Sequence, residues 1–356
     1  MLIKKSNINV LDRFITQAVE LIRGARLQAI RQTNSLMVFT YFQLGKLIVE
    51  EEQSGKSKAA YGEEIIKQLS KVLTKQFGRG FSPRNLASIR LFYLQYHSKL
   101  KSPILQTASA KSEALSRISF PDIFPLSWSH YVTLLAVKDD SERSFYEIES
   151  IQNNWSVREL KRQYDSGLFE RLALSKDKQR VKQLAGKGQL VEKPEDVIKS
   201  PYILEFLGLD EKAAYTESDL ESAIINKIEH FLLEMGKGFL FGGRQVRFSI
   251  DDEDFYVDLV LYNRLLQCFV LVDLKIGKLK HQDIGQMQMY VNYYDRFIKK
   301  DFEKPTVGII ICKNKSDAVV EITLPKDNKT IFAKEYKLYL PSKAELKQLV
   351  SGEVER

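Results

Sequence analysis

The segment FYVDLVLYNRLLQCFVLVDLKIGKLKHQDIGQMQMYVNYYDR, residues 255–296, holds two apolar runs that each enclose one acidic residue. The first run is interrupted only by Asp258 and the second only by Asp273, and a short polar connector separates the runs. Two runs of this kind on either side of a polar turn predict an antiparallel β-hairpin. Because a charge inside an apolar strand is costly, each acid requires a partner or a function.

The two acids are equally distant from the middle of the connector, at residues 265–266. Antiparallel pairing around that point makes Asp258 and Asp273 cross-strand or diagonal neighbours, about 5–8 Å apart. Lys275 follows Asp273 by two residues, so the two side chains share one face of the strand, with about 7 Å of rise between their Cα atoms. The sequence therefore predicts two carboxylates and one ammonium group in one place.

This grouping of side chains suits the hydrolysis of a phosphodiester. Two close carboxylates can hold Mg²⁺ or Mn²⁺, and Mg²⁺ prefers oxygen ligands and keeps several waters. A bound metal ion acidifies a water and neutralises a phosphate oxygen. A lysine beside it can orient that water or stabilise the charge of the transition state. The simpler alternative is a buried ion pair with Lys275, but such a pair adds little net stability and does not explain why two acids interrupt two core strands.

These residues resemble the signature of the PD-(D/E)xK nucleases, as Val257-Asp258 followed by Asp273-Leu274-Lys275. Gln286-Met-Gln-Met-Tyr290 is similar to the QxxxY element of the RecB-like branch. A wider set of strings resembles the bacterial YhcG-like proteins, namely Phe231-Leu-Leu-Glu-Met-Gly-Lys-Gly-Phe239, Gly243-Arg-Gln245, Asp254-Phe-Tyr-Val-Asp258 and Gly285-Gln-Met. The chain departs from the signature at Val257, the proline position, and at Asp273, where glutamate is commoner.

The resemblance implies an α/β fold, with an all-helical N-terminal domain followed by a PD-(D/E)xK (restriction-endonuclease-like) α/β domain that has a central mixed sheet. It implies catalytic roles for Asp258, Asp273, Lys275, Gln286 and Tyr290. It implies metal ligands from Asp258, Asp273, the carbonyl of Leu274 and an acid of the domain's first helix, here Glu221. Glu221 also has a local interpretation, because Ser218-Asp-Leu-Glu221 has the form of a capping box. Both interpretations of Glu221 stay open.

The order of elements in the second half is the order expected of this nuclease fold. A helix from Ser218 to Met235 precedes a strand at 239–250, the hairpin, a helix that carries Gln286, and a buried strand at 306–312. Two further elements are expected beyond them, an edge strand at 337–340 and a terminal helix at 342–350.

The first half predicts a helical domain. Apolar residues recur at helical spacing in the ranges 8–31, 34–52, 61–77, 83–97, 127–137, 142–152 and 156–172. The strongest helix start is Ser82-Pro83, an N-cap followed by proline at the first helical position. Residues 98–118, rich in Ser, Lys and Ala, indicate a loop.

Two groups of basic residues in this half are candidates for nucleic-acid contact. Helix, glycine turn and helix around residues 78–80 resemble a helix-turn-helix, with Arg84 and Arg90 on the recognition helix. A later helix carries Arg158, Lys161 and Arg162. Residues 1–180 contain 28 Lys and Arg against 18 Asp and Glu, which suits an anionic polymer. An ordinary helical corner and a solvated basic surface explain these residues at least as well.

The length of 356 residues allows two domains. A charged stretch with Gly and Pro predicts the division, with a helical domain at 1–172, a linker at 173–200 and a nuclease domain at 201–356. No apolar run approaches a membrane span and the N-terminus lacks the apolar stretch of a signal peptide, so we expect a cytoplasmic protein with no membrane partner. Cys268 and Cys312 lie in apolar runs and are expected to be buried thiols.

The leading hypothesis is a Mg²⁺- or Mn²⁺-dependent nuclease acting on DNA, whose helical domain binds nucleic acid or a partner. One alternative is a nucleic-acid-binding or protein-interaction protein that keeps the nuclease fold with weak or no activity. Another is a scaffold whose helical half self-associates, which leaves a homo-oligomer open. A nuclease needs Lys275 and a divalent metal, whereas a binder keeps a salt-dependent affinity when the acids are removed.

Overall fold

The computed structural model describes residues 3–54, 59–98, 123–173, 178–210, 214–342 and Glu345. The chain divides into two compact units. One comprises Met1–Arg143 with Ser150–Val157, and the other comprises Ser144–Glu149 with Arg158–Arg356. The predicted loop at 98–118 and the predicted terminal helix at 342–350 lie almost wholly outside the described residues. Within the described residues, no helix is both long and apolar enough to cross a membrane.

The first unit is helical, as predicted. It contains α1 (Ile3–Ser54), α2 (Ala59–Phe77), α3 (Pro83–Tyr96) and α6 (Trp128–Leu134), while α7 (Asp140–Gln152) contributes residues to both units. Ile48 of α1 packs against Leu86 and Ile89 of α3. Gly45 permits this close packing, because a Cβ atom there would lie 2.4 Å from the carbonyl oxygen of Ile89.

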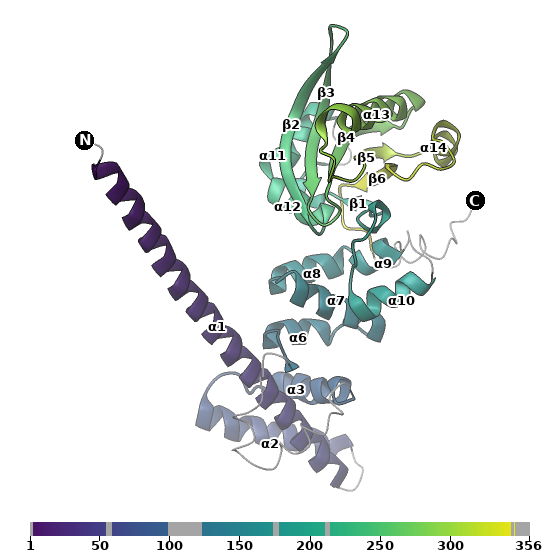
Figure 1. Ribbon diagram of the computed structural model, residues 1–356. Coiled ribbons are helices and arrows are strands. Elements are labelled where there is room, and N and C mark those ends of the chain that lie inside the picture. Colours follow the sequence, from purple (N-terminus) through teal and green to yellow (C-terminus); the bar gives the residue numbers. More distant parts are fainter. Residues whose placement is uncertain are drawn as a thin grey trace. The chain divides into compact units, whose positions relative to one another are not determined.

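α1 is one continuous helix of 52 residues, where the sequence predicted two helices at 8–31 and 34–52. The expected break fell at residues 32–33, just before Asn34, and Thr33 and Asn34 are weak helix formers. Compared with alanine, such residues lower helix stability by only a few tenths of a kcal/mol each, about 0.7 kcal/mol at most. Neither proline nor a left-handed glycine interrupts the helix hydrogen bonds there. Figure 1 shows the N-terminal part of α1 extending away from α2 and α3.

α3 begins as predicted. Ser82 is the N-cap, its Oγ accepts a hydrogen bond from the Asn85 N–H at 3.3 Å, and Pro83 takes the first helical position. The predicted helix at 156–172 is instead two helices, α8 (Val157–Asp165) and α9 (Leu168–Ala173). The chain turns between them at Gly167, whose φ of 61° is left-handed and favours glycine.

The stretch expected to be a linker, 173–200, is largely structured. It contains α10 (Lys178–Lys187), and Val197 and Ile198 belong to a hydrophobic core that also includes residues of the sheet. The apolar residues at its end are buried because they pack on the second unit, which begins well before residue 201.

The second unit is built on a mixed sheet, as predicted, and the sheet has six strands in the described residues. Its strands are β1 (Tyr202–Ile203), β2 (Phe239–Ile250), β3 (Glu253–Asn263), β4 (Cys268–Lys278), β5 (Val307–Asn314) and β6 (Ile331–Lys337). They lie in the order β1-β6-β5-β4-β3-β2. β2, β3 and β4 pair antiparallel and the other neighbours pair parallel. The strand predicted at 337–340 corresponds to β6, which lies earlier in the chain and between two strands rather than at the edge.

Helices cover both faces of the sheet (Figure 1). α11 (Glu217–Asn226) and α12 (Ile228–Met235) pack on one face, and α13 (His281–Tyr293) and α14 (Asp317–Thr323) on the other. β5 shows the alternation that this requires, because Ile309 faces the first layer and Ile310 the second. α13 connects the parallel strands β4 and β5 and runs close to the sheet, since a Cβ on Gly308 would lie 2.6 Å from Met287.

Candidate active site

The β3–β4 register brings the two acids together at the end of the hairpin ladder. Asn263 pairs with Cys268 and Leu259 pairs with Val272, so Asp258 and Asp273 are the next opposing residues. Beyond that point the Asp258 carboxylate replaces a backbone acceptor, and its Oδ2 accepts a hydrogen bond from the Leu274 N–H at 2.8 Å. The predicted hairpin, its turn and the juxtaposition of the acids are therefore confirmed.

Asp273 and Lys275 form an ion pair in a nearly dry environment. Asp273 is 2% exposed, and its Oδ2 lies 3.0 Å from Lys275 Nζ. Burial raises the pKa of Asp273 to about 7, with Asp258 adding to the rise and Lys275 opposing it. Burial acts to lower the pKa of Lys275, but the charges of Asp273 and of Glu217, 3.6 Å away, outweigh it and raise that pKa. Lys275 is therefore a fixed positive charge at neutral pH.

Glu221 lies buried on α11 and does not cap it. The capping box belongs to Thr216 and Asp219, whose side chains bond each other's backbone N–H at 3.1 Å and 2.8 Å. The box predicted at 218–221 is wrong by two residues, because a Thr-x-x-Asp pattern overlaps the Ser-x-x-Glu pattern and starts the helix earlier. The helix expected to reach Met235 also breaks at Lys227, between α11 and α12. Glu221, 5% exposed, remains free to face the site.

Gln245 of β2 connects Glu221 to Asp258. Its Nε2 lies 2.6 Å from Glu221 Oε2 and 3.0 Å from Asp258 Oδ1. Glu221 Oε1 lies 3.1 Å from Arg244 Nε. The sequence placed Gln245 only within a string of family likeness and gave it no role. The signal that could have found it is Gly242-Gly243, where the β2–β3 register shifts, because glycine inside a strand often marks a bulge.

Gln286 and Tyr290 lie on α13 beside the site, engaged with each other and with β3. Gln286 Nε2 donates to Tyr290 Oη, which donates to the carbonyl of Tyr256 at 2.8 Å. Tyr256 precedes Asp258 by two residues, so this chain of hydrogen bonds fixes the strand that carries the acid. Burial raises the pKa of Tyr290, and the charges of Asp273 and Asp258 add to the rise.

The donor set at this site fits a hard divalent cation. Asp273 Oδ2 and Glu221 Oε1 are buried and have no well-formed hydrogen bond in the described part of the chain, although Lys275 and Arg244 lie within ion-pair distance. The N–H and C=O of one strand residue point to the same side, so the Leu274 carbonyl faces the region of the Asp258 carboxylate.

No cluster of three or more His, Cys, Asp or Glu side chains that could hold a metal is found among the described residues. A cation here would be held through carboxylate and carbonyl oxygens together with several waters, which is the coordination habit of Mg²⁺.

The basic residues predicted to contact nucleic acid belong to both units. Arg84 is exposed on α3, whereas Arg90 of the same helix pairs with Glu52 at 2.6 Å. Arg158, Lys161 and Arg162 belong to the second unit. The first two are exposed on α8, but Arg162 is mostly buried among glutamates, with its Nε 3.2 Å from Glu205.

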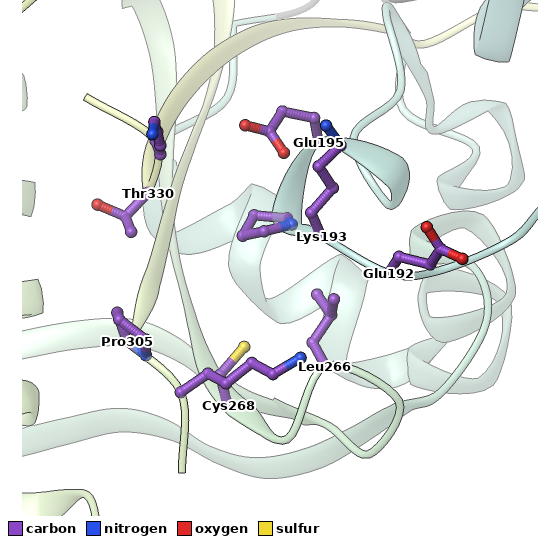
Figure 2. A pocket seen from close by; sticks show the side chains of 10 residues that line it. Glu192, Lys193, Glu195, Leu266, Cys268, Pro305 and Thr330 are labelled. Carbon is purple, nitrogen blue, oxygen red and sulfur yellow. The ribbon is translucent and has the colours of Figure 1, made fainter. Parts of the chain in front are cut away.

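A pocket of about 410 Å³ opens where β4, β5 and β6 begin (Figure 2). Its lining includes Leu266, Cys268, Pro305 and Thr330 together with charged residues at 192–195. None of the predicted site residues lines it. Burial raises the pKa of the Cys268 thiol to about 11, so the thiol stays protonated and is a poor nucleophile. The acids at the end of the β3–β4 ladder are therefore the candidate site.

A mixed sheet whose hairpin juxtaposes Asp258 with Asp273-Leu274-Lys275, followed by a crossover helix, defines a nuclease domain of the PD-(D/E)xK class. Residues 195–351 match the family model described as the YhcG PDDEXK nuclease domain, and residues 17–171 match the DUF1016 N-terminal domain.

The chain is 41% identical over 340 residues to the Escherichia coli (strain K12) protein named "Putative nuclease YhcG", covering 92% of this chain and 90% of that protein. The chain therefore belongs to the YhcG family. A crystal structure of a repair endonuclease from Pyrococcus abyssi matches 36% of this chain and 50% of its own, at 18% identity and a TM-score of 0.24, which is too low to support an argument.

Proposed function

We propose that this chain is a divalent-metal-dependent nuclease that hydrolyses phosphodiester bonds of DNA. The observation that carries the proposal is the placement of Asp258 opposite Asp273 at the end of the β3–β4 ladder, with Lys275 Nζ 3.0 Å from Asp273. An ordinary core would not bury the Asp273 carboxylate beside a second, half-buried carboxylate at Asp258, because burial without full pairing costs roughly several kcal/mol per ion. Membership of the YhcG family supports the same reaction class.

Each side chain of the site then has a role. Asp258 and Asp273, with Glu221 and the carbonyl of Leu274, would hold Mg²⁺ or Mn²⁺. When bound, the metal would acidify a water and neutralise charge on a phosphate oxygen. Lys275 carries its proton at neutral pH, so it donates hydrogen bonds and stabilises transition-state charge rather than accepting a proton.

Gln286 and Tyr290 would keep β3 in place through the carbonyl of Tyr256. The helical N-terminal domain would bind the nucleic acid or a partner, since residues 1–180 carry the excess of Lys and Arg. The alternative function, a nucleic-acid-binding or interaction protein that keeps this fold without activity, predicts binding to DNA with no product.

The test is a cleavage assay with the full chain on linear duplex, single-stranded and branched DNA, in Mg²⁺, Mn²⁺ or EDTA. The matched variants are Asp273→Asn, Lys275→Met and, as a control, Lys278→Met, which changes an exposed lysine later in β4. We expect cleavage by the wild type and the control only, and only with metal. Binding to every substrate without cleavage in any metal would replace the nuclease with the binding protein.

A further inference from the structure

Gln245 has a backbone conformation that glutamine rarely adopts. Its φ is 45°, in the left-handed region, although it lies inside β2. Arg244 pairs with Leu259 and Val246 pairs with Val257, so Gln245 stands opposite Asp258. Non-glycine residues persist in this region only where the surrounding structure holds them there, and such positions cluster at functional sites.

The unusual backbone places a carboxamide between two acids from different elements. Gln245 Nε2 is 2.6 Å from Glu221 Oε2 on α11 and 3.0 Å from Asp258 Oδ1 on β3. One NH₂ group thus donates a charge-assisted hydrogen bond to each carboxylate. It holds the two like charges together without adding a charge of its own.

These bonds also determine which carboxylate oxygens remain available. Gln245 donates to Glu221 Oε2, while the buried Glu221 Oε1 lacks a well-formed hydrogen bond in the described chain and has the Arg244 Nε 3.1 Å away as an ion-pair partner. Asp258 is held from two sides, by Gln245 at Oδ1 and by the Leu274 N–H at Oδ2. Groups that hydrogen-bond a ligating carboxylate orient it and commonly change metal affinity by roughly 10–100-fold when lost.

We propose that Gln245 is a positioning residue of the metal site, which sets its cation affinity by holding Glu221 and Asp258 in one arrangement. The proposal rests on the proposed function, because it takes the acids to be metal ligands. It adds a residue from β2 to a metal site whose ligands the sequence predicted from β3, β4 and α11.

The test is a titration of the full chain with Mn²⁺ alone, followed by calorimetry, so that no catalytic turnover is needed. Gln245→Met keeps the size of the side chain and removes its polar atoms. Gln245→Asn keeps the amide and tolerates the left-handed backbone, but is one methylene too short to reach both acids. Gln267→Met is the control, because Gln267 is an exposed glutamine with a φ of 55° at the β3–β4 turn.

We expect both Gln245 variants to weaken Mn²⁺ binding by on the order of 10–100-fold and the Gln267 variant to match the wild type. If Gln245→Met does not fold, Gln245→Asn alone decides the result. Wild-type affinity in a folded Gln245 variant would show that the amide is only a structural crosslink, and the proposed function would stand. A wild type that takes up no Mn²⁺ at millimolar concentration would overturn both this inference and the metal-dependent nuclease.

Discussion

Lys275 combines a partly buried position with a charge that its neighbours stabilise. Asp273 and Glu217 raise its pKa above the ordinary value despite burial, so it acts as a hydrogen-bond donor at any physiological pH. Removing one such preorganised donor typically costs about 10²–10³ in rate. We therefore expect Lys275→Met to lower the single-turnover rate of DNA cleavage by about that factor, and Lys278→Met to leave it within about twofold. An equal loss in both variants would point to a general effect of charge on DNA binding.

Lys199, which is not part of the candidate site, makes the free energy of unfolding depend on pH. It is 1% exposed, its Nζ donates to the backbone carbonyl of Glu234, and burial lowers its pKa to about 8, although Glu234 opposes the shift. In the unfolded chain a lysine has a pKa of about 10.4, so between these values the unfolded state binds more protons. The stability from neutral Lys199 is therefore present above about pH 10.4 and is lost as the pH falls through about 8.

Lys199→Met should remove this pH dependence. The free energy of unfolding of the sheet-containing unit should rise between pH 7.5 and 9.5 in the wild type and stay flatter in the variant, measured by hydrogen exchange of β4 and β5 amides. The window ends below the titration of Tyr202, whose pKa burial raises. Lys193→Met, at an exposed lysine of the same unit, should keep the rise. An unchanged rise in Lys199→Met would place the titration on another group.

At the scale of elements, local patterns predicted those structures whose cause is local. The hairpin followed from two apolar runs and a turn, and α3 followed from Ser82 and Pro83. The start of α11 was missed because two capping patterns overlap within residues 216–221. α1 was divided in two because polar residues at its middle look like a boundary. The role of Gln245 was missed because the acid it bonds on α11 lies 24 residues away in the chain.

The β2–β3 turn carries strain that a substitution should relieve. Asp251 and Asp252 have φ values of 48° and 65°, and Ile250 pairs with Glu253, which is the geometry of a two-residue type I′ turn. Glycine is preferred at the second position of that turn, since a side chain there costs about 1 kcal/mol. We expect Asp252→Gly to stabilise the second unit by about 0.5–1 kcal/mol in urea denaturation. Asp301→Gly, in an exposed turn without positive φ, should not stabilise it.

For the whole molecule, the sequence predicted two domains, and its first half has an excess of basic residues. The sequence placed the sheet-containing domain at 201–356. The structure extends that unit back to Arg158, with Ser144–Glu149 in addition. The reason is a buried charge cluster. Glu234 of α12 is fully buried, bonds Arg171 of α9 and accepts the Ile203 N–H at 2.9 Å. Arg171 and Glu234 are 63 residues apart in the chain, so no local sequence pattern predicts that they pair.

This cluster predicts which fragment folds. Residues 201–356 lack Arg171, Lys199 and Arg162, the cations around Glu234, and a buried charge that loses its partner costs about 3–5 kcal/mol. We expect 140–356 to unfold cooperatively in urea, and 201–356 to be less stable by at least that amount. Glu234→Gln should then act with opposite signs, destabilising 140–356, where it leaves Arg171 unpaired, and stabilising 201–356, where it removes an isolated charge. Equal free energies of unfolding for the two fragments would show that residues 173–200 act as a linker and add no stability to the sheet-containing unit.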